Sequence, residues 1–259
     1  MAGIKIPVFE SGCVLTHEML ETLKNYSMDF SGLTFDGFSN GIVSGCRVSM
    51  QGNTISVDRG IIKYENRIFL IPAGMKAVVT PGNEWHILQF NIDNINRENN
   101  FLTCNVQLDI STDSQNSGSK IEICRFRLQG GAQLRNQYQD YNDLNTEYDT
   151  VNEIYAKWSG YQKETVSVRI LEEFAKEAIH KGVQNPQDVA MIQQILTLCG
   201  KSINRDCLQF YISSRLSRPY KELSNLEIYK SLGEVLRNLR TNGDRGPVRP
   251  RDERRIIVD

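Results

Sequence analysis

The sequence predicts an α+β protein of several parts: an N-terminal all-β meander or sandwich-like domain, a polar helical connector, a small C-terminal helical bundle and an extended tail. Three observations predict it. Short alternating runs cut by Gly and Asn fill residues 38–130, helical spacing of apolar residues begins near residue 165, and a segment rich in Pro and Arg closes the chain. The boundaries we expect are 1–134, 135–164, 165–242 and 243–259.

The β-rich part is expected to begin with a short helix over residues 16–26. Thr16 can cap this helix, and Met19, Leu20 and Leu23 follow at helical spacing. Gly and Ser then dominate residues 31–45, which predicts a loop or edge strands there.

A β-meander is predicted for residues 44–72, SGCRVSMQGNTISVDRGIIKYENRIFLIP. Gly and Asn in its turns supply the positive φ angles of tight hairpins. About four short strands are expected, over 47–50, 54–58, 61–64 and 67–71. Longer strands are expected over 85–93, 101–110 and 120–128, and the last should contain a bulge at Cys124–Arg125, where the alternation slips.

The connector, NQYQDYNDLNTEYDTVNEIYAKWSG at 136–160, is rich in Asn, Asp and Tyr and poor in aliphatic residues. Its larger side chains lie three to four residues apart, which predicts a thin amphipathic helix carrying Tyr141, Leu144, Tyr148, Val151 and Tyr155. The tyrosine stripe either packs on a partner or forms a half-exposed seam within the chain, and the residues alone leave both open.

Four short helices are predicted after residue 165. The first ends at Gly182, and Asn185–Pro186 begins the second, with Val189, Ile192, Ile195 and Leu196 facing inward. The third covers 204–213, and the capping box Ser224–Glu227 opens the fourth. Together they predict a small all-α domain.

Fragments of catalytic and metal-binding motifs occur in this sequence, but each lacks the neighbouring residues or elements that its chemistry needs. The G-x-S-x-G match at 37–41 is followed by strands where a helix is required, and the GKS at 200–202 lacks its preceding glycine. The three histidines lack a second ligand at helical spacing, and the six cysteines, without a C-x-x-C pair, are expected to be reduced and buried. We therefore expect no catalytic residue, no metal and no cofactor.

Charge and hydropathy also exclude several partners. A net charge of -1 and a pI near 6.3 argue against nucleic acid, and no run reaches the ~20 apolar residues of a membrane helix. We expect no membrane insertion and folding in the cytoplasm, because no signal peptide is evident. A glycan hydrolase needs only two carboxylates, which leaves that possibility open through Asp93, Asp109, Glu122 and Asp140.

The Gly-punctuated meander of residues 45–72 resembles segments near the N-termini of baseplate and tail-fibre-attachment proteins of bacteriophages and phage-tail-like contractile particles, the R-type bacteriocins and contractile injection systems. The connector followed by a small helical domain is similar to such a component of Gram-positive type. The resemblance implies a structural protein, not an enzyme, that joins the baseplate to a fibre or to neighbouring subunits. Its implied partners are other baseplate or fibre proteins and copies of itself as a homo-oligomer. It implies assembly in the cytoplasm and release as part of the particle.

An assembly part of this kind concentrates its contact energy in a few aromatic or apolar anchors. The interface candidates are Tyr141, Tyr148, Tyr155, Trp158, Ile256, Ile257 and Val258. Trp85 belongs either to the core or to an interface. Two other hypotheses stay open: a fibre subunit that binds carbohydrate or a cell surface, marked by an exposed aromatic platform, and a glycan hydrolase, marked by an acidic cleft.

Overall fold

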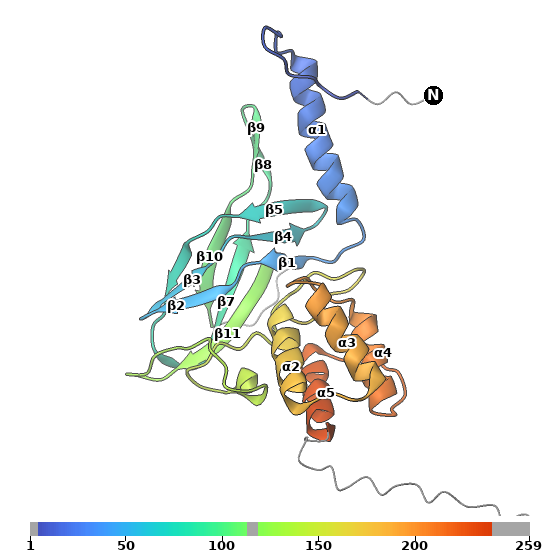
Figure 1. Cartoon of the computed structure of the whole chain (residues 1–259). Coiled ribbons are helices and arrows are strands. Elements are labelled where there is room, and N and C mark those ends of the chain that lie inside the picture. Colours follow the sequence, from blue (N-terminus) through green and yellow to red (C-terminus); the bar gives the residue numbers. More distant parts are fainter. Residues whose placement is uncertain (1–4, 113–118, 240–259) are drawn as a thin grey trace, which may run out of the picture.

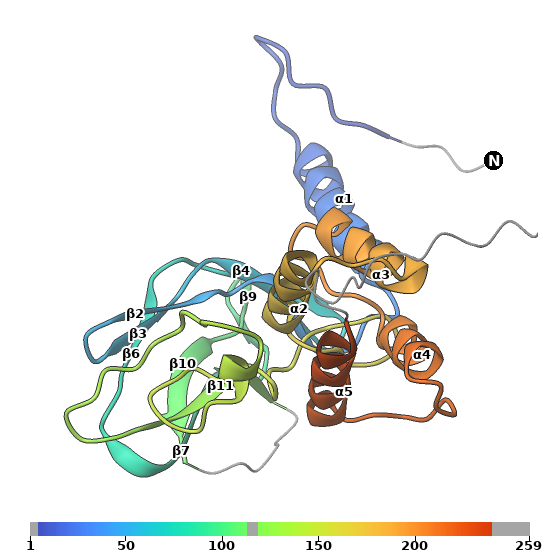
Figure 2. The same ribbon diagram turned by 60° about the horizontal axis from the view of Figure 1, so that its bottom comes forward.

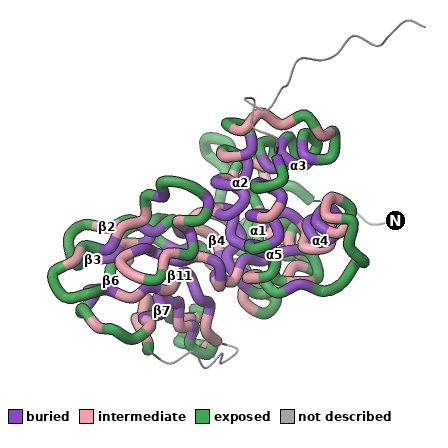
Figure 3. Tube along the Cα trace, turned by 90° about the horizontal axis from the view of Figure 1, so that it is seen from below, coloured by how far each residue is buried: buried purple, intermediate pink, exposed green. Residues whose placement is uncertain are grey.

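The computed structural model describes residues 5–112 and 119–239. Within these residues, a strand-rich part precedes a set of helices, which confirms the α+β class (Figure 1). The two parts lie side by side, and each has its own buried core (Figure 3). The predicted tail at 243–259, with Ile256, Ile257 and Val258, lies outside the described residues.

Helix α1 (His17–Thr34) begins where the sequence predicts but ends eight residues later than the expected Tyr26. The Thr16 hydroxyl accepts a hydrogen bond from the Met19 N–H at 3.3 Å, which confirms the cap. The loop expected from residue 31 is wrong at its start. Apolar residues continue at helical spacing through Phe30 and Leu33, and a single glycine inside such a run does not end a helix.

The meander region forms two three-stranded antiparallel sheets instead of one continuous meander. One sheet has the order β1 (Gly41–Gly45), β4 (Gly60–Tyr64), β5 (Arg67–Ile71), and the other has the order β2 (Val48–Gln51), β3 (Thr54–Val57), β6 (Met75–Val78). All four expected strands form, but β3 and β4 do not pair. The chain turns at Gly60 and returns to β1, where Gly45 and Gly60 stand opposite each other.

A third antiparallel sheet has the order β10 (Val106–Ser111), β7 (Gly82–Ile92), β11 (Lys120–Leu128). The bulge in β11 is confirmed, although the register shifts between Glu122 and Cys124, just before the expected place. The strand expected over 101–110 is divided. Its first residues form β9 (Phe101–Thr103), which pairs with β8 (Asn96–Glu98) in a separate hairpin whose turn contains Asn99 at φ 51°.

The four C-terminal helices are confirmed: α2 (Val168–Lys181), α3 (Pro186–Thr197), α4 (Arg205–Arg215) and α5 (Asn225–Asn238). Side-chain caps begin all four, and both hydrogen bonds of the predicted capping box are present. On α3 the inward face differs from the prediction. Val189 and Leu196 are exposed, whereas Met191 is buried beside Ile192 and Ile195. Viewed from a second direction, α2 is the helix nearest the strands (Figure 2).

The connector is not a continuous helix. Only η1 (Asn142–Asn145), a 3-10 turn, is helical within residues 136–160. Its short polar side chains bind nearby backbone groups instead: Asp140 Oδ1 accepts from the Asp143 N–H at 3.0 Å, and Asn152 Oδ1 accepts from the Ile154 N–H at 2.9 Å. Such local bonds compete with helical ones and favour turns.

Residues 149–160, which we call the bridging segment, pair with strands on both sides. Arg125 in β11 and Asn152 exchange two backbone hydrogen bonds of 2.8 Å. Further along, Ile42 in β1 donates to the Lys157 carbonyl and accepts from the Ser159 N–H, both at 2.8 Å. The bridging segment therefore connects the sheet that contains β11 to the sheet that contains β1.

The cysteines only partly follow the expectation. All six are free, and Cys46 and Cys124 are buried, but Cys13 and Cys199 are exposed. Cys199 lies just beyond the end of α3, with a φ of 48°. Burial raises the pKa of the Cys46 thiol to about 12, which keeps this thiol protonated and unreactive.

Gly60 provides a test of the close pairing of β4 with β1. An added Cβ there would lie 2.5 Å from the Cys46 backbone nitrogen and 2.7 Å from the Ser44 carbonyl oxygen. We expect Gly60→Ala to lower the free energy of unfolding by about 3 kcal/mol, because backbone atoms must move. Gly130→Ala, where a Cβ meets nothing within 4 Å, is the matched control and should be nearly neutral. Urea unfolding of both variants measures the difference, and equal stabilities would contradict the close packing.

Candidate interaction surface

Helix α1 stands apart from both cores. It leaves the strands as a single helix, and only its C-terminal end approaches them (Figure 1). There the Lys63 ammonium donates to the Phe35 carbonyl at the end of the helix, at 2.7 Å. None of its residues is buried, and even its large side chains are open to solvent: Tyr26 is 70 % exposed and Leu33 is 78 % exposed. Most helices in proteins gain their stability from packing of an apolar face, and the described residues 5–112 and 119–239 bury no residue of α1.

Other parts of the chain also expose apolar side chains. The hairpin β8–β9 projects beyond the sheets on the side from which α1 leaves, and its Phe101 and Leu102 are exposed (Figure 1). The segment before α1 also exposes large apolar side chains, those of Ile6, Val8, Phe9, Val14 and Leu15. Large apolar side chains that stay exposed in a patch are typical of protein-contact sites. We call α1, the segment 5–16 before it and the β8–β9 hairpin the apolar projection.

The sequence indicated the helix but not the extent of this surface. Phe30, Leu33, Phe101 and Leu102 were not among the expected interface residues. A signal for the first two was available, because the spacing that begins at Met19 continues unbroken to Leu33. The hairpin gave no such signal, because its strands have three residues each.

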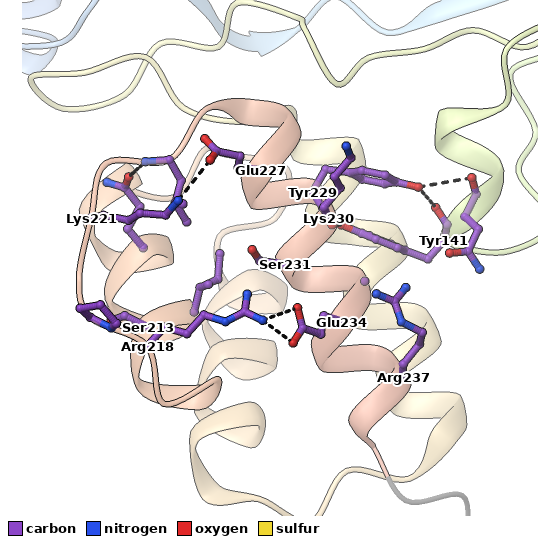
Figure 4. A pocket seen from close by; sticks show the side chains of 16 residues that line it. Tyr141, Ser213, Arg218, Lys221, Glu227, Tyr229, Lys230, Ser231, Glu234 and Arg237 are labelled. Atoms are coloured by element: carbon purple, nitrogen blue, oxygen red, sulfur yellow. Dashed lines mark hydrogen bonds and ion pairs between the residues drawn. The ribbon is translucent and has the colours of Figure 1, made fainter.

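Tyr141, an expected interface residue, lies inside the helical core at 1 % exposure. Its ring stacks on that of Tyr229 with centroids 4.9 Å apart, and each hydroxyl donates to the other residue's backbone carbonyl, at 3.0 and 3.1 Å (Figure 4). Gly233 of α5 lies beside the same ring, where an added Cβ would make an ordinary van der Waals contact with Tyr141 at 3.4 Å. A partner could contact Tyr141 only if this core opened.

The other expected aromatic residues also contact their own chain. Trp158 is buried in the strand core, and the Arg125 guanidinium lies 3.8 Å from the centroid of the half-buried Tyr155 ring. Arg127 lies 4.8 Å from the Trp85 ring and 5.6 Å from the Tyr148 ring. Both of these rings are half-buried. The placements correspond to the seam within the chain that the sequence left open, and a role in an interface stays a prediction.

A pocket of about 380 Å³ opens beside Tyr141 and Tyr229, between η1, α5 and the segment after α4 (Figure 4). Its charged side chains largely pair with one another. Arg218 donates to both carboxylate oxygens of Glu234 at 2.7 and 2.9 Å, and Lys221 lies 3.3 Å from Glu227. Burial raises the pKa of Tyr229 to about 12, so its phenol remains a protonated hydrogen-bond donor. The ion pairs that line the pocket join the segment after α4 to α5.

The four carboxylates considered for glycan hydrolysis do not gather at one place. Asp109 and Glu122 flank Gln89 across β7, where Glu122 accepts two hydrogen bonds of 2.8 Å from Arg125. Asp109 accepts one from Asn91 at 3.2 Å. Asp93 follows the end of β7, and Asp140 lies in the connector. Within residues 5–112 and 119–239, no group of three or more His, Cys, Asp or Glu side chains could hold a metal ion.

Known proteins resemble this chain only in structure. No family model and no curated protein matches the sequence. A solved structure described as the crystal structure of TssK shares 6% identity over 90% of this chain and 71% of that chain, with a TM-score of 0.40. A TssK-TssF-TssG baseplate subcomplex of the type VI secretion system contains a chain with 10% identity, 92% and 99% coverage and a TM-score of 0.43.

A third structure, described as the baseplate complex from the type VI secretion system, gives 9% identity, 91% and 99% coverage and a TM-score of 0.37. All three TM-scores lie below 0.5, so no property of those proteins is transferred to this chain on this ground. In the part of the chain that the structure describes, no helix is both long and apolar enough to cross a membrane.

The Tyr141 hydroxyl offers a test of the seam. We expect Tyr141→Phe to lower the free energy of unfolding by about 1–3 kcal/mol, because the Tyr229 carbonyl loses a buried donor. Tyr148→Phe keeps a ring beside Arg127 and is the matched control, with an expected change near zero. Denaturant unfolding of the free chain measures both. A neutral Tyr141→Phe variant would contradict a structural role for this hydroxyl.

The pair Arg135–Asp143 predicts a dependence on pH. Hydrogen bonds from the Arg135 guanidinium, 2.5 Å to Oδ2 and 2.6 Å to Oδ1, hold the pKa of Asp143 well below its usual range. A lowered carboxyl pKa stabilises the fold above its unfolded value of about 3.9, and this contribution falls as the pH drops toward the folded value. The stability difference between the natural chain and Asp143→Asn should therefore stay constant above about pH 5 and shrink progressively below about pH 4. A constant difference in unfolding experiments would contradict the assignment.

Proposed function

We propose that this protein is a structural component of a phage-tail-like contractile particle, which joins the baseplate to a fibre or to neighbouring subunits through protein–protein contacts. The observation that carries the proposal is α1, an 18-residue helix with large apolar side chains and no buried residue. A surface of this kind is costly in water and is explained when another protein covers it.

The way in which the two cores are joined supports this role; we call the strand-rich part and the four C-terminal helices together the body. The strand core and the helical core are joined through the bridging segment, so both can act as one support for the apolar projection. The resemblance of the meander to baseplate and tail-fibre-attachment proteins supplies the class of assembly. On this proposal, the partners are other baseplate or fibre proteins of an R-type bacteriocin or contractile injection system of Gram-positive type. Assembly takes place in the cytoplasm before the particle is released.

A second candidate is a fibre subunit that binds carbohydrate. Trp85 and Tyr148, the two half-buried rings on either side of Arg127, favour it, because aromatic rings are common contacts for sugars. Each ring already contacts the Arg127 guanidinium, which leaves less of its surface for a ligand. The apolar projection has no role in this alternative.

Co-expression with the products of neighbouring genes tests the proposal. We expect the full chain to sediment with a large assembly and a chain without residues 1–34 to be reduced at least tenfold in it, because the contact helix is missing. The removed residues belong to neither core, so the shortened chain should keep its thermal unfolding transition. The double variant Phe101→Ser with Leu102→Ser tests the hairpin, and a chain that ends at Asn242 tests the tail. Both chains should be incorporated into the assembly more weakly than the full chain.

Equal incorporation of the full and shortened chains would contradict the role of α1. A full chain that joins no neighbour but binds glycans on an array would contradict the proposal and favour the second candidate. Loss of glycan binding in Trp85→Ala would then locate the sugar site.

A further inference from the structure

Five large apolar side chains of α1 alternate at spacings of four and three residues: Met19, Leu23, Tyr26, Phe30 and Leu33. Two others, Leu20 and Met28, lie outside this series. A mean spacing of 3.5 residues places a narrow stripe along one side of a helix that winds around another helix. In heptad notation Leu23 and Phe30 occupy a positions, and the other three occupy d positions. We call these five residues the α1 stripe.

The positions beside the α1 stripe are small or uncharged with one exception. Leu20, Ser27 and Thr34 occupy e positions, and Thr22 and Asp29 occupy g positions within the helix. A helix that packs on a broad core usually carries a wider apolar face, whereas a stripe limited mainly to a and d is typical of a helix–helix seam. Tyr26 and Phe30 stack on each other with centroids 6.3 Å apart, which adds to one continuous edge.

Most charges of α1 lie on its other side, and two of its carboxylates have a basic partner within the chain. The Lys5 ammonium lies 2.6 Å from Glu18, and His17 lies 3.5 Å from Glu21. A strongly charged partner would thus find little to pair with on the stripe. An identical stripe, by contrast, presents apolar side chains along the same length and places no charge in the seam.

We propose that α1 packs against α1 of a second copy of this chain, through the α1 stripe, as a short coiled coil. This inference rests on the proposed function, in which α1 is a contact element, and it names the partner of that helix. The second copy is available in equal amount and carries a stripe of matching length and spacing.

The length of α1 bounds the strength of this contact. An 18-residue helix is about 27 Å long, and such a seam buries less than the roughly 800 Å² per partner of a standard stable interface. Self-association of the free chain should therefore be reversible, in the micromolar range or weaker. When neighbouring subunits hold two copies close together, the effective concentration rises and the seam should become fully occupied.

Sedimentation velocity of the full chain from about 1 to 300 µM tests the proposal. We expect the mass to rise toward that of two copies as the concentration increases. Leu23→Glu with Phe30→Glu places two charges in the seam and should weaken association at least tenfold. Asn25→Glu with Met28→Glu adds the same two charges to the outer side of α1 and is the matched control. It should associate like the natural chain. Because none of these residues is buried, both variants should keep the unfolding temperature of the body.

A full chain that stays monomeric at every concentration would overturn the proposal. So would a control variant that loses association as completely as the seam variant. These failures can be told apart from failure of the proposed function. A monomeric chain whose incorporation still requires residues 1–34 would mean that α1 binds a different subunit. A chain that dimerises through the seam but joins no neighbour would keep this inference and remove the assembly role.

Discussion

The structure depends on the backbone hydrogen bonds of the bridging segment. Residues 149–160 pair with β11 through an isolated bridge at Asn152 and then cross to β1, so that a stretch with few aliphatic residues joins two sheets. Val151, Ala156 and Trp158 enter the strand core from this segment, whereas Ile154 enters the helical core. Without these bonds, the two edges would expose unpaired backbone groups.

This connection explains why α1 can project without destabilising the rest. The body buries its large side chains in two cores that do not include α1, so folding does not require the helix to be covered. The free energy available from its apolar surface is then released on association instead of on folding. On the proposed function, such a subunit would fold before it assembles, with the Lys63–Phe35 hydrogen bond linking the end of its contact helix to β4.

Features set by neighbouring residues could be predicted from the sequence, and features set by distant contacts could not. Thr16, Asn185, Ser224 and Gly182 mark helix ends because a cap depends on residues within one turn. The return of β4 to β1 depends on the space beside Gly60, and the burial of Tyr141 depends on Tyr229, 88 residues away. Neither is visible in local spacing. The predicted end of α1 is wrong because the Gly and Ser content of residues 31–45 favours a loop, whereas the helical spacing of apolar residues continues to Leu33.

Hydrogen–deuterium exchange of the α1 amides tests the central claim most directly, in the free chain at low concentration and again in the assembled particle. The account predicts fast exchange along α1 in the dilute chain and strong protection after assembly, while α2 and α5 are protected in both states. Strong protection of α1 in the dilute monomer, equal to that of α2, would contradict it. The helix would then already be covered by its own chain and would not be a contact element.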